Sequence, residues 1–328
     1  MRDLILKRNQ QFAVASTPLP GSEAYDNERP LNIPGRYDGM TLWEVVLDLF
    51  PQIAASQWDE WFSSGHLMQD SLPVRRSRRV RGGESFVHLF PATVEPRVNA
   101  DIRCIWEDDS LVGLIKPAPL PVHPCGRFNR NTLSYFVDEV FGRDTLRLIH
   151  RLDSNTSGLM VLAKSPEAAS HLGEQFESGA IEKQYLARVI GVPDRMTFSC
   201  DARIGRNRID AGGRSVQEKG QAAETLFTVL RDFSDGTSLV QATPKTGRTN
   251  QIRIHLWEVG FPILGDPTYL PEKQTCARQT LSIEDPPMCL HAHSLRFIHP
   301  HSRCETKLEA EVPSWASAGS SDGHVATF

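Results

Sequence analysis

The stretch LIHRLDSNTSGLMVLAKS, residues 148–165, decides how the rest of the chain is interpreted. It places one acid, Asp153, between a His-Arg pair and a Thr-Ser-Gly turn, and an apolar run typical of a buried strand follows directly. At its end, Ser165 and then Pro166 are typical of a helix cap and the first helical position. No obvious acid partner, metal ligand or nucleophilic serine accompanies Asp153, so a reaction centred here would depend on one carboxylate.

The composition indicates a soluble globular chain. Its 328 residues are 40% hydrophobic and 23% charged, which predicts two domains, one with a large core and one with a smaller core. The formal net charge of −4 predicts no overall basic field, so a site for a polyanion would need local clustering. Six scattered cysteines without a C-x-x-C pair indicate a reducing cytoplasm. No signal peptide and no apolar run of about 20 residues is found, so we expect no membrane association.

The first third of the chain is predicted to form an arm and a small module. Residues 1–36 are rich in Pro, Asn and Gly and predict an extended arm or a loosely packed strand. In residues 37–97, Thr41 and Glu44 predict a capping box on a first helix, and Ser56 and Gly65 predict the cap and the end of a second. Short strands follow, with a basic cluster at Arg75, Arg76, Arg78 and Arg79.

From residue 98 the pattern favours strands joined by short turns, which predicts an α+β domain with a largely antiparallel, mixed sheet over residues 98–315. A flexible tail is expected over residues 316–328, where Ser and Gly are frequent. The strand-like stretches are IRCIWEDDSLVGLIK (102–116), GLMVLAK (158–164), EKQYLARVIGV (182–192), ETLFTVLRDF (224–233), TSLVQATPK (237–245) and LHAHSLRFIHP (290–300).

Three motifs in this domain, in this order, resemble those of the RluA-type pseudouridine synthases: HRLDSNTSG (150–158), EKQYLARV (182–189) and TGRTNQIRIHL (246–256). Three further stretches extend the resemblance from residue 115 to residue 300, essentially the whole larger domain: IKPAPLPVHP, PILGDPTYL and LHAHSLRFIHP. Residues 37–92, with two capped helices and a basic sheet, resemble the S4 RNA-binding module, although the Trp-rich SQWDEWFSSG departs from its usual wording.

The resemblance implies an enzyme that detaches uracil from ribose in structured RNA and reattaches it through C5, without metal or cofactor. It implies that Asp153 is the catalytic carboxylate, that Arg253 pairs with it, and that Tyr185 packs against the target uracil. By the same motifs, Arg151, Arg248, Thr249 and Gln251 would bind substrate, whereas His150 and Lys183 would be structural or contact backbone. The RNA could be ribosomal or transfer RNA, and we expect a monomer.

Several alternatives stay open. Asn250 stands where the family usually has histidine; it can donate and accept hydrogen bonds but cannot titrate near neutrality. Arg75, Arg76, Arg78 and Arg79 could be a solvated face rather than an RNA-binding surface. The chain could also be a non-catalytic RNA-binding protein. Finally, it could be a zinc-binding module, since Cys289, His291, His293, His299, His301 and Cys304 lie within one short stretch.

Overall fold

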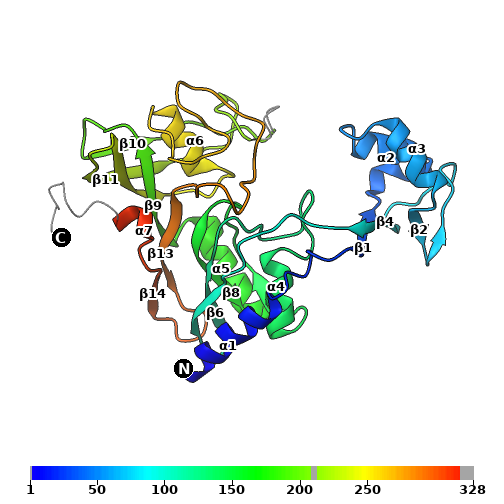
Figure 1. The fold of residues 1–328 in the computed structure, drawn as a ribbon, viewed down its shortest axis with the longest axis horizontal. Helices are drawn as coiled ribbons and strands as arrows, with labels where there is room; N and C mark the ends of the chain where they lie inside the picture. The colour runs from blue at the N-terminus through cyan, green and yellow to red at the C-terminus, as the bar shows by residue number, and fades with distance from the viewer. Residues whose placement is uncertain (1, 208–212, 318–328) are drawn as a thin grey trace. The chain divides into compact units, whose positions relative to one another are not determined.

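The computed structural model describes residues 2–207 and 213–317, in two compact units (Figure 1). The smaller unit is Gly21–Glu95, and the larger unit combines Met1–Pro20 with Pro96–Phe328. Each has its own hydrophobic core, and we describe each by itself.

The larger unit is built on a ten-stranded sheet with the order β10-β11-β12-β9-β13-β8-β6-β5, with β14 beside β13 and β7 beside β8. Every pairing is antiparallel except that of β13 with β8, so the sheet is mixed and largely antiparallel, as the sequence predicts. Its strands are β5 (Arg103–Glu107), β6 (Leu111–Lys116), β7 (Arg147–Leu148), β8 (Ser157–Ala163), β9 (Glu182–Ile190), β10 (Thr197–Cys200), β11 (Thr225–Asp232), β12 (Thr237–Pro244), β13 (Leu290–Ile298) and β14 (Glu305–Glu309).

Helices cover both faces of this sheet. Alternate residues of β6 point to opposite faces, so Val112 and Leu114 pack with α1 and α4, whereas Leu111 and Ile115 pack with α5. On the other half of the sheet, α6 contacts β10, β11 and β12, and α7 contacts β9 (Figure 1). These helices are α1 (Arg2–Ala15), α4 (Leu133–Phe141), α5 (Pro166–Ser178), α6 (Gln251–Glu258) and α7 (Ser314–Ser317).

The smaller unit has a four-stranded sheet with the order β1-β4-β2-β3. The predicted capping box is confirmed: Thr41 accepts a hydrogen bond from the Glu44 backbone, and the Glu44 side chain accepts from Thr41. Trp58 is fully buried in the core of this unit. Its elements are β1 (Tyr25–Asn32), the 3-10 helix η1 (Gly35–Tyr37), α2 (Leu42–Leu49), α3 (Ala55–Ser63), β2 (Leu67–Gln69), β3 (Leu72–Pro73) and β4 (Ser85–Thr93).

The structure corrects some local predictions. The predicted extended arm over residues 1–36 is wrong in its first half, because Arg2–Ala15 form a helix whose Phe12 enters the core of the larger unit. The second half contains β1, which pairs along its length with β4. Helix α3 begins one residue before Ser56 and has no side-chain cap. The expected tail, residues 316–328, lies outside the described residues from residue 318 on.

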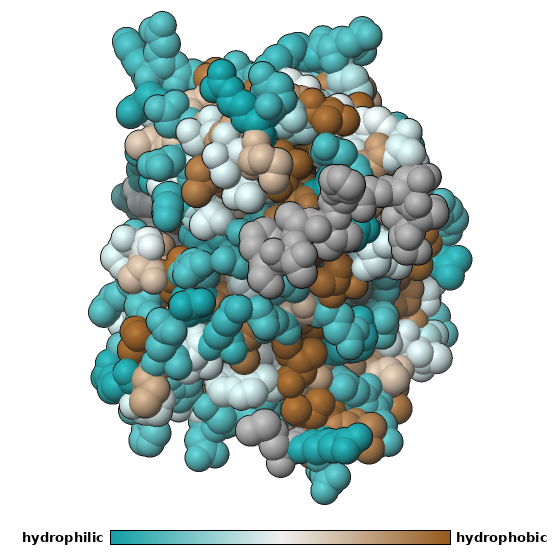
Figure 2. Space-filling view, turned by 90° about the vertical axis from the view of Figure 1, so that its left-hand side faces the viewer, coloured by the Kyte–Doolittle hydropathy of each residue, from teal (hydrophilic) through white to brown (hydrophobic). Residues whose placement is uncertain are grey.

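Among residues 2–207 and 213–317, no helix is both long and apolar enough to span a bilayer. On the face drawn in Figure 2, apolar side chains form separate small patches between hydrophilic ones.

Candidate active site

The first two motifs meet at the middle of the large sheet, where β13 lies between β8 and β9. Ala292 of β13 is in register with Gly158 of β8 and with Tyr185 of β9. Gly158 has φ of +115°, and a Cβ there would lie 2.3 Å from the carbonyl oxygen of Ala292. Only glycine allows this backbone approach, which explains the glycine of the Thr-Ser-Gly turn. The close pairing brings the Asp153 loop to the strand of Tyr185.

A buried lysine, Lys116, holds the backbone of the loop that carries Asp153. The ammonium of Lys116, at the end of β6, donates to the carbonyl oxygens of Pro117 (2.9 Å), Leu120 (2.8 Å) and Ser154 (3.2 Å). Burial lowers the pKa of Lys116 to about 7, and the negative charge of Asp153 opposes that shift. Because Ser154 directly follows Asp153, these bonds position the backbone of the carboxylate.

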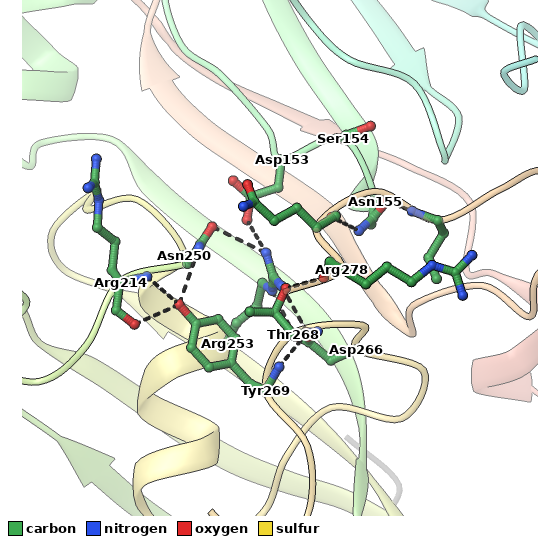
Figure 3. A network of polar contacts seen from close by, with 12 residues as sticks. Asp153, Ser154, Asn155, Arg214, Asn250, Arg253, Asp266, Thr268, Tyr269 and Arg278 are labelled. Atoms are coloured by element: carbon green, nitrogen blue, oxygen red, sulfur yellow. Dashed lines mark hydrogen bonds and ion pairs between the residues drawn. The ribbon is translucent and has the colours of Figure 1, made fainter. Parts of the chain in front are cut away.

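Arg253 on α6 contacts two carboxylates (Figure 3). Its Nε and Nη2 donate to Asp266 at 2.7 and 2.8 Å, and its Nη1 donates to Asp153 at 3.3 Å. Asp266 also accepts from the backbone N–H groups of Thr268 (2.8 Å) and Tyr269 (3.0 Å). Burial works against the charge on Arg253, but Asp266 first and Asp153 second raise its pKa. The guanidinium is therefore permanently charged and clamped by Asp266, with one N–H directed at Asp153.

Asn250 extends this network to Tyr269. It has φ of +58° just before α6, where asparagine is tolerated better than most residues. Its Oδ1 accepts from Arg253 at 3.2 Å and its Nδ2 donates to the Tyr269 hydroxyl at 3.3 Å (Figure 3). Asn250 thus uses one acceptor and one donor at once, as a neutral imidazole could.

Tyr185 is half-buried and packs against two of the hydrophobic clusters of the larger unit. Burial, and then the charge of Asp153, raise the pKa of its phenol. The hydroxyl therefore keeps its proton at neutral pH and can act as a hydrogen-bond donor or acid. Asp153, Tyr185 and Arg253, predicted from three separate motifs, are thus brought to one site.

The other predicted substrate-binding residues of the larger unit divide into two groups. Arg151 is exposed, and Arg248 and Thr249 line a small cavity, so all three can meet a ligand. Gln251 differs, because its side chain is bonded within the unit. Its Oε1 accepts from the Thr246 hydroxyl and the Arg248 backbone N–H, and its Nε2 donates to the carbonyl oxygen of Glu224 and the hydroxyl of Thr225. A side-chain amide has two donors and two acceptor positions, so these bonds occupy the Gln251 amide within the unit. Its contact with substrate stays a prediction.

The basic cluster of the smaller unit is largely engaged within that unit. Arg76 pairs with Asp59 at 2.7 Å, Arg78 pairs with Glu84 at 2.9 Å, and Arg79 donates to the carbonyl oxygen of Gly39. Arg75 is exposed. These contacts leave Arg75, Arg76 and Arg79 at the surface but tie part of their charge to neighbours.

His150 and Lys183 contact backbone, as the sequence predicts. His150 accepts from Val161 N–H at 3.0 Å and stacks on Phe176, and burial lowers its pKa to about 4. Lys183 donates to the carbonyl oxygen of Thr246 at 3.4 Å.

The Cys- and His-rich stretch is part of β13 and its turn. His291 bonds to the Ser157 hydroxyl, and His299 bonds to Asp108. Within residues 2–207 and 213–317, no group of three or more His, Cys, Asp and Glu residues could hold a metal ion. His291 and His299 therefore make their contacts within the larger unit.

Two residues at the site were not predicted. Lys116 and Asp266 both lie in stretches that share the family resemblance, IKPAPLPVHP and PILGDPTYL, but neither stretch indicates a partner. A lysine that ends an apolar strand and an acid in a Gly-Asp-Pro turn are the signals that could have identified them.

The chain is similar to known proteins of one family. Residues 110–258 match the family model described as RNA pseudouridylate synthase. Ribosomal large subunit pseudouridine synthase D of Nitrosomonas europaea is 32% identical over 302 residues, covering 89% of this chain and 87% of that protein. RNA pseudouridine synthase 7 of Arabidopsis thaliana is 31% identical over 330 residues, covering 86% and 82%. The solved structure of human RNA pseudouridylate synthase domain containing 4 is 29% identical with a TM-score of 0.52, covering 65% of this chain and 90% of that one.

Proposed function

Because the chain belongs to the RNA pseudouridylate synthase family, we propose that Asp153, Arg253 and Tyr185 form its catalytic centre. The protein is an RNA pseudouridine synthase, an isomerase that converts uridine in RNA to pseudouridine. In this reaction the bond from ribose C1′ to uracil N1 breaks and a bond from C1′ to C5 forms. N1 gains a proton and C5 loses one, so atoms and electrons balance without an oxidant or reductant.

The Asp153 carboxylate acts on the electron-poor centre that forms when the glycosidic bond breaks, as nucleophile or as charge stabiliser. The observation that supports this role is the bond from Arg253 Nη1 to Asp153, 3.3 Å, with Arg253 itself clamped by the buried Asp266. A fixed guanidinium orients the carboxylate before substrate arrives. Lys116 holds the adjoining backbone, so little rearrangement is needed during the reaction.

Tyr185 packs against the target uracil and keeps a protonated hydroxyl near the base. The raised pKa of the phenol supports a donor role rather than that of an anionic base. The target nucleotide must leave its helix or loop, because C1′ and the base cannot be reached within a stack. Exposed Arg151 lies on the same loop as Asp153 and would hold the displaced nucleotide.

The substrate is proposed to be large-subunit ribosomal RNA rather than transfer RNA. This choice is supported by relatives in Nitrosomonas europaea and Pseudomonas aeruginosa that are named ribosomal large subunit pseudouridine synthase D, each at 31–32% identity over most of the chain. Arg75, Arg76, Arg78 and Arg79 in the S4-like smaller unit would contact phosphates of this RNA.

The protein is further proposed to act as a monomer in the cytoplasm. On the one face drawn in Figure 2 the apolar patches are small and separate, whereas stable interfaces usually need a larger contiguous apolar area. Six free cysteines, Cys104 and Cys289 buried among them, support a reducing compartment.

Pseudouridine mapping tests the proposed function. Large-subunit ribosomal RNA and transfer RNA are labelled chemically in cells with the gene, without it, and with Asp153→Asn in its place. We expect pseudouridine to be missing from a ribosomal RNA position without the gene, restored by the wild type and not by Asp153→Asn. Loss of a transfer RNA position instead would overturn the choice of substrate, and restoration by Asp153→Asn would overturn the role of Asp153.

A further inference from the structure

A small cavity beside the active site is lined by three arginines. It has a volume of about 150 Å³ and is formed by Ile204, Gly205, Arg206, Arg214, Gln221, Arg248 and Thr249. These residues come from the segment between β10 and β11 and from the turn before α6.

The three guanidinium groups have little to neutralise them. Among the described residues, no carboxylate forms an ion pair with Arg206, Arg214 or Arg248. Arg248 donates through Nε to the carbonyl oxygen of Ala222 at 3.0 Å, which fixes the side chain. Within the part of the chain that the structure describes, its two Nη groups form no hydrogen bond and stay available to a ligand. Lys183 lies close enough to feel this charge, since burial and then the Arg248 charge lower the pKa of Lys183.

The wall of this cavity is connected to the catalytic network. The Tyr269 hydroxyl accepts from the Arg214 N–H and donates to the Arg214 carbonyl, both at 2.8 Å, while it accepts from Asn250. Asn250 in turn accepts from Arg253, which donates to Asp153 (Figure 3). Gly213 permits this packing, because a Cβ there would lie 2.7 Å from the Tyr269 hydroxyl. The position of Arg214 is therefore fixed relative to Asp153.

We propose that this cavity binds one backbone phosphate of the RNA strand that carries the target uridine. The inference rests on the proposed function, since it takes RNA as the substrate. Guanidinium groups match phosphate oxygens in bidentate geometry, and several of them without a carboxylate partner around a small polar cavity favour a phosphate group over an extended apolar ligand. A phosphate held here would fix the strand at a set position from Asp153, so that the displaced uridine reaches Tyr185.

The test measures RNA affinity at several salt concentrations for the wild type, Arg206→Gln, Arg214→Gln and the double variant of the full chain. The matched control is Arg195→Gln, which removes an exposed arginine of the same unit away from the cavity. Two probes are used: an unmodified transcript of large-subunit ribosomal RNA, and polyuridylate, which presents the same phosphates without a target structure.

Each single variant is expected to weaken binding of both probes by about 10- to 100-fold. The double variant should add little to the effect of either one, because both side chains bind the same phosphate. The log-log salt slope should fall by about 0.7 to 0.9 in the double variant, the change for one phosphate contact. Independent, multiplying losses with twice that change in slope, or variants indistinguishable from Arg195→Gln, would contradict a shared phosphate.

A second measurement separates an RNA phosphate from a free anion. Modification of Arg206 and Arg214 by phenylglyoxal is followed by mass spectrometry with polyuridylate or with inorganic phosphate. We expect RNA to protect both arginines. Protection by inorganic phosphate and none by RNA would identify a site for a free anion and overturn the proposal. Neither result depends on Asp153 or on the target RNA, so failure of the proposed function would be seen separately, as turnover by Asp153→Asn.

Discussion

Arg253 of the larger unit and Arg76 of the smaller unit each pair with an aspartate, but in opposite surroundings. The side chains of Arg253 and Asp266 are 5% and 1% exposed, whereas those of Arg76 and Asp59 are 59% and 54% exposed. Both pairs have their closest atoms 2.7 Å apart. Distance alone therefore does not distinguish a buried pair, which holds Arg253 beside Asp153, from a pair at the surface.

The two ion pairs differ in how far they are buried, and burial determines how much each contributes to stability. Water screens an exposed pair, and its two long side chains lose conformational freedom when they meet, so the net stabilisation is small. A buried guanidinium without its partner would leave a charge with no compensation, so Arg253 and Asp266 depend on each other. The larger unit thus uses arginine to fix one geometry, and the smaller unit presents arginine to solvent, where it can meet a mobile polyanion.

Among substitutions of the residues around Asp153, Arg253→Met is expected to have the largest effect on both stability and rate. It leaves Asp266 buried without its cation, which should lower the free energy of unfolding by about 3–5 kcal/mol. Pseudouridine formation should slow by about 100-fold or more, because Asp153 loses the group that orients it. Chemical denaturation and single-turnover kinetics measure the two effects.

The matched control is Arg76→Met, which breaks the exposed pair with Asp59. It should lower the free energy of unfolding by less than about 1 kcal/mol. Similar losses for the two variants would mean that burial does not separate the pairs.

Two substitutions of Tyr185 separate the stacking of its ring on the base from proton transfer by its hydroxyl. Tyr185→Ala should weaken RNA binding by about 1–3 kcal/mol, the contribution of a base stacked on an aromatic ring, whereas Tyr185→Phe should retain most of the affinity. Tyr185→Phe should still slow the reaction, because the protonated hydroxyl is lost. Equal affinities for the two variants, measured by titration at fixed salt, would argue against stacking.

Substitutions of Asn250 test whether its hydrogen bonds to Arg253 and Tyr269 contribute to the reaction rate. Asn250→Gly keeps a residue that tolerates φ of +58° and removes the amide with its two hydrogen bonds. The rate should fall by about 3- to 10-fold, since a hydrogen bond contributes about 1 kcal/mol. Asn250→His should stay close to wild type, because imidazole can also donate and accept. A histidine variant as slow as the glycine variant would show that the amide itself is required.

The smallest effect per residue is expected in the basic cluster of the smaller unit. Replacing Arg75, Arg76, Arg78 and Arg79 with Gln should weaken RNA binding and lower its log-log salt slope by about 0.7 to 0.9 for each lost phosphate contact. Affinity at several salt concentrations measures both quantities. Unchanged affinity and slope would make these arginines a solvated face, with the larger unit recognising RNA unaided.

Local signals in the sequence were sufficient for several elements. Helix α5 begins as Ser165 and Pro166 predict, with the Ser165 hydroxyl accepting from Ala168 N–H, and it ends at Gly179 in the left-handed conformation. The strands around the three motifs also form where their apolar patterns predict. Caps and alternation depend on residues close in the chain, so the sequence contains the needed information.

Other features depend on contacts between distant residues. The stretch QIRIHLWE alternates as a strand does, yet it forms α6 because most of its residues are buried on several sides at once. Arg2–Ala15 has little apolar periodicity and becomes a helix by packing Phe12 into the larger unit. The bidentate bond from Arg253 to Asp266 depends on how the turn after α6 folds back, which neither residue reveals alone.

One carboxylate, Asp153, held by a buried cation, is proposed to perform the isomerisation. Single-turnover formation of pseudouridine by Asp153→Asn, with RNA in excess over its dissociation constant, tests it most directly. The substitution removes the charge and keeps the side-chain volume, so RNA binding and folding should stay close to wild type while pseudouridine formation falls below detection. Substantial turnover by Asp153→Asn would contradict the proposed role of the Asp153 carboxylate.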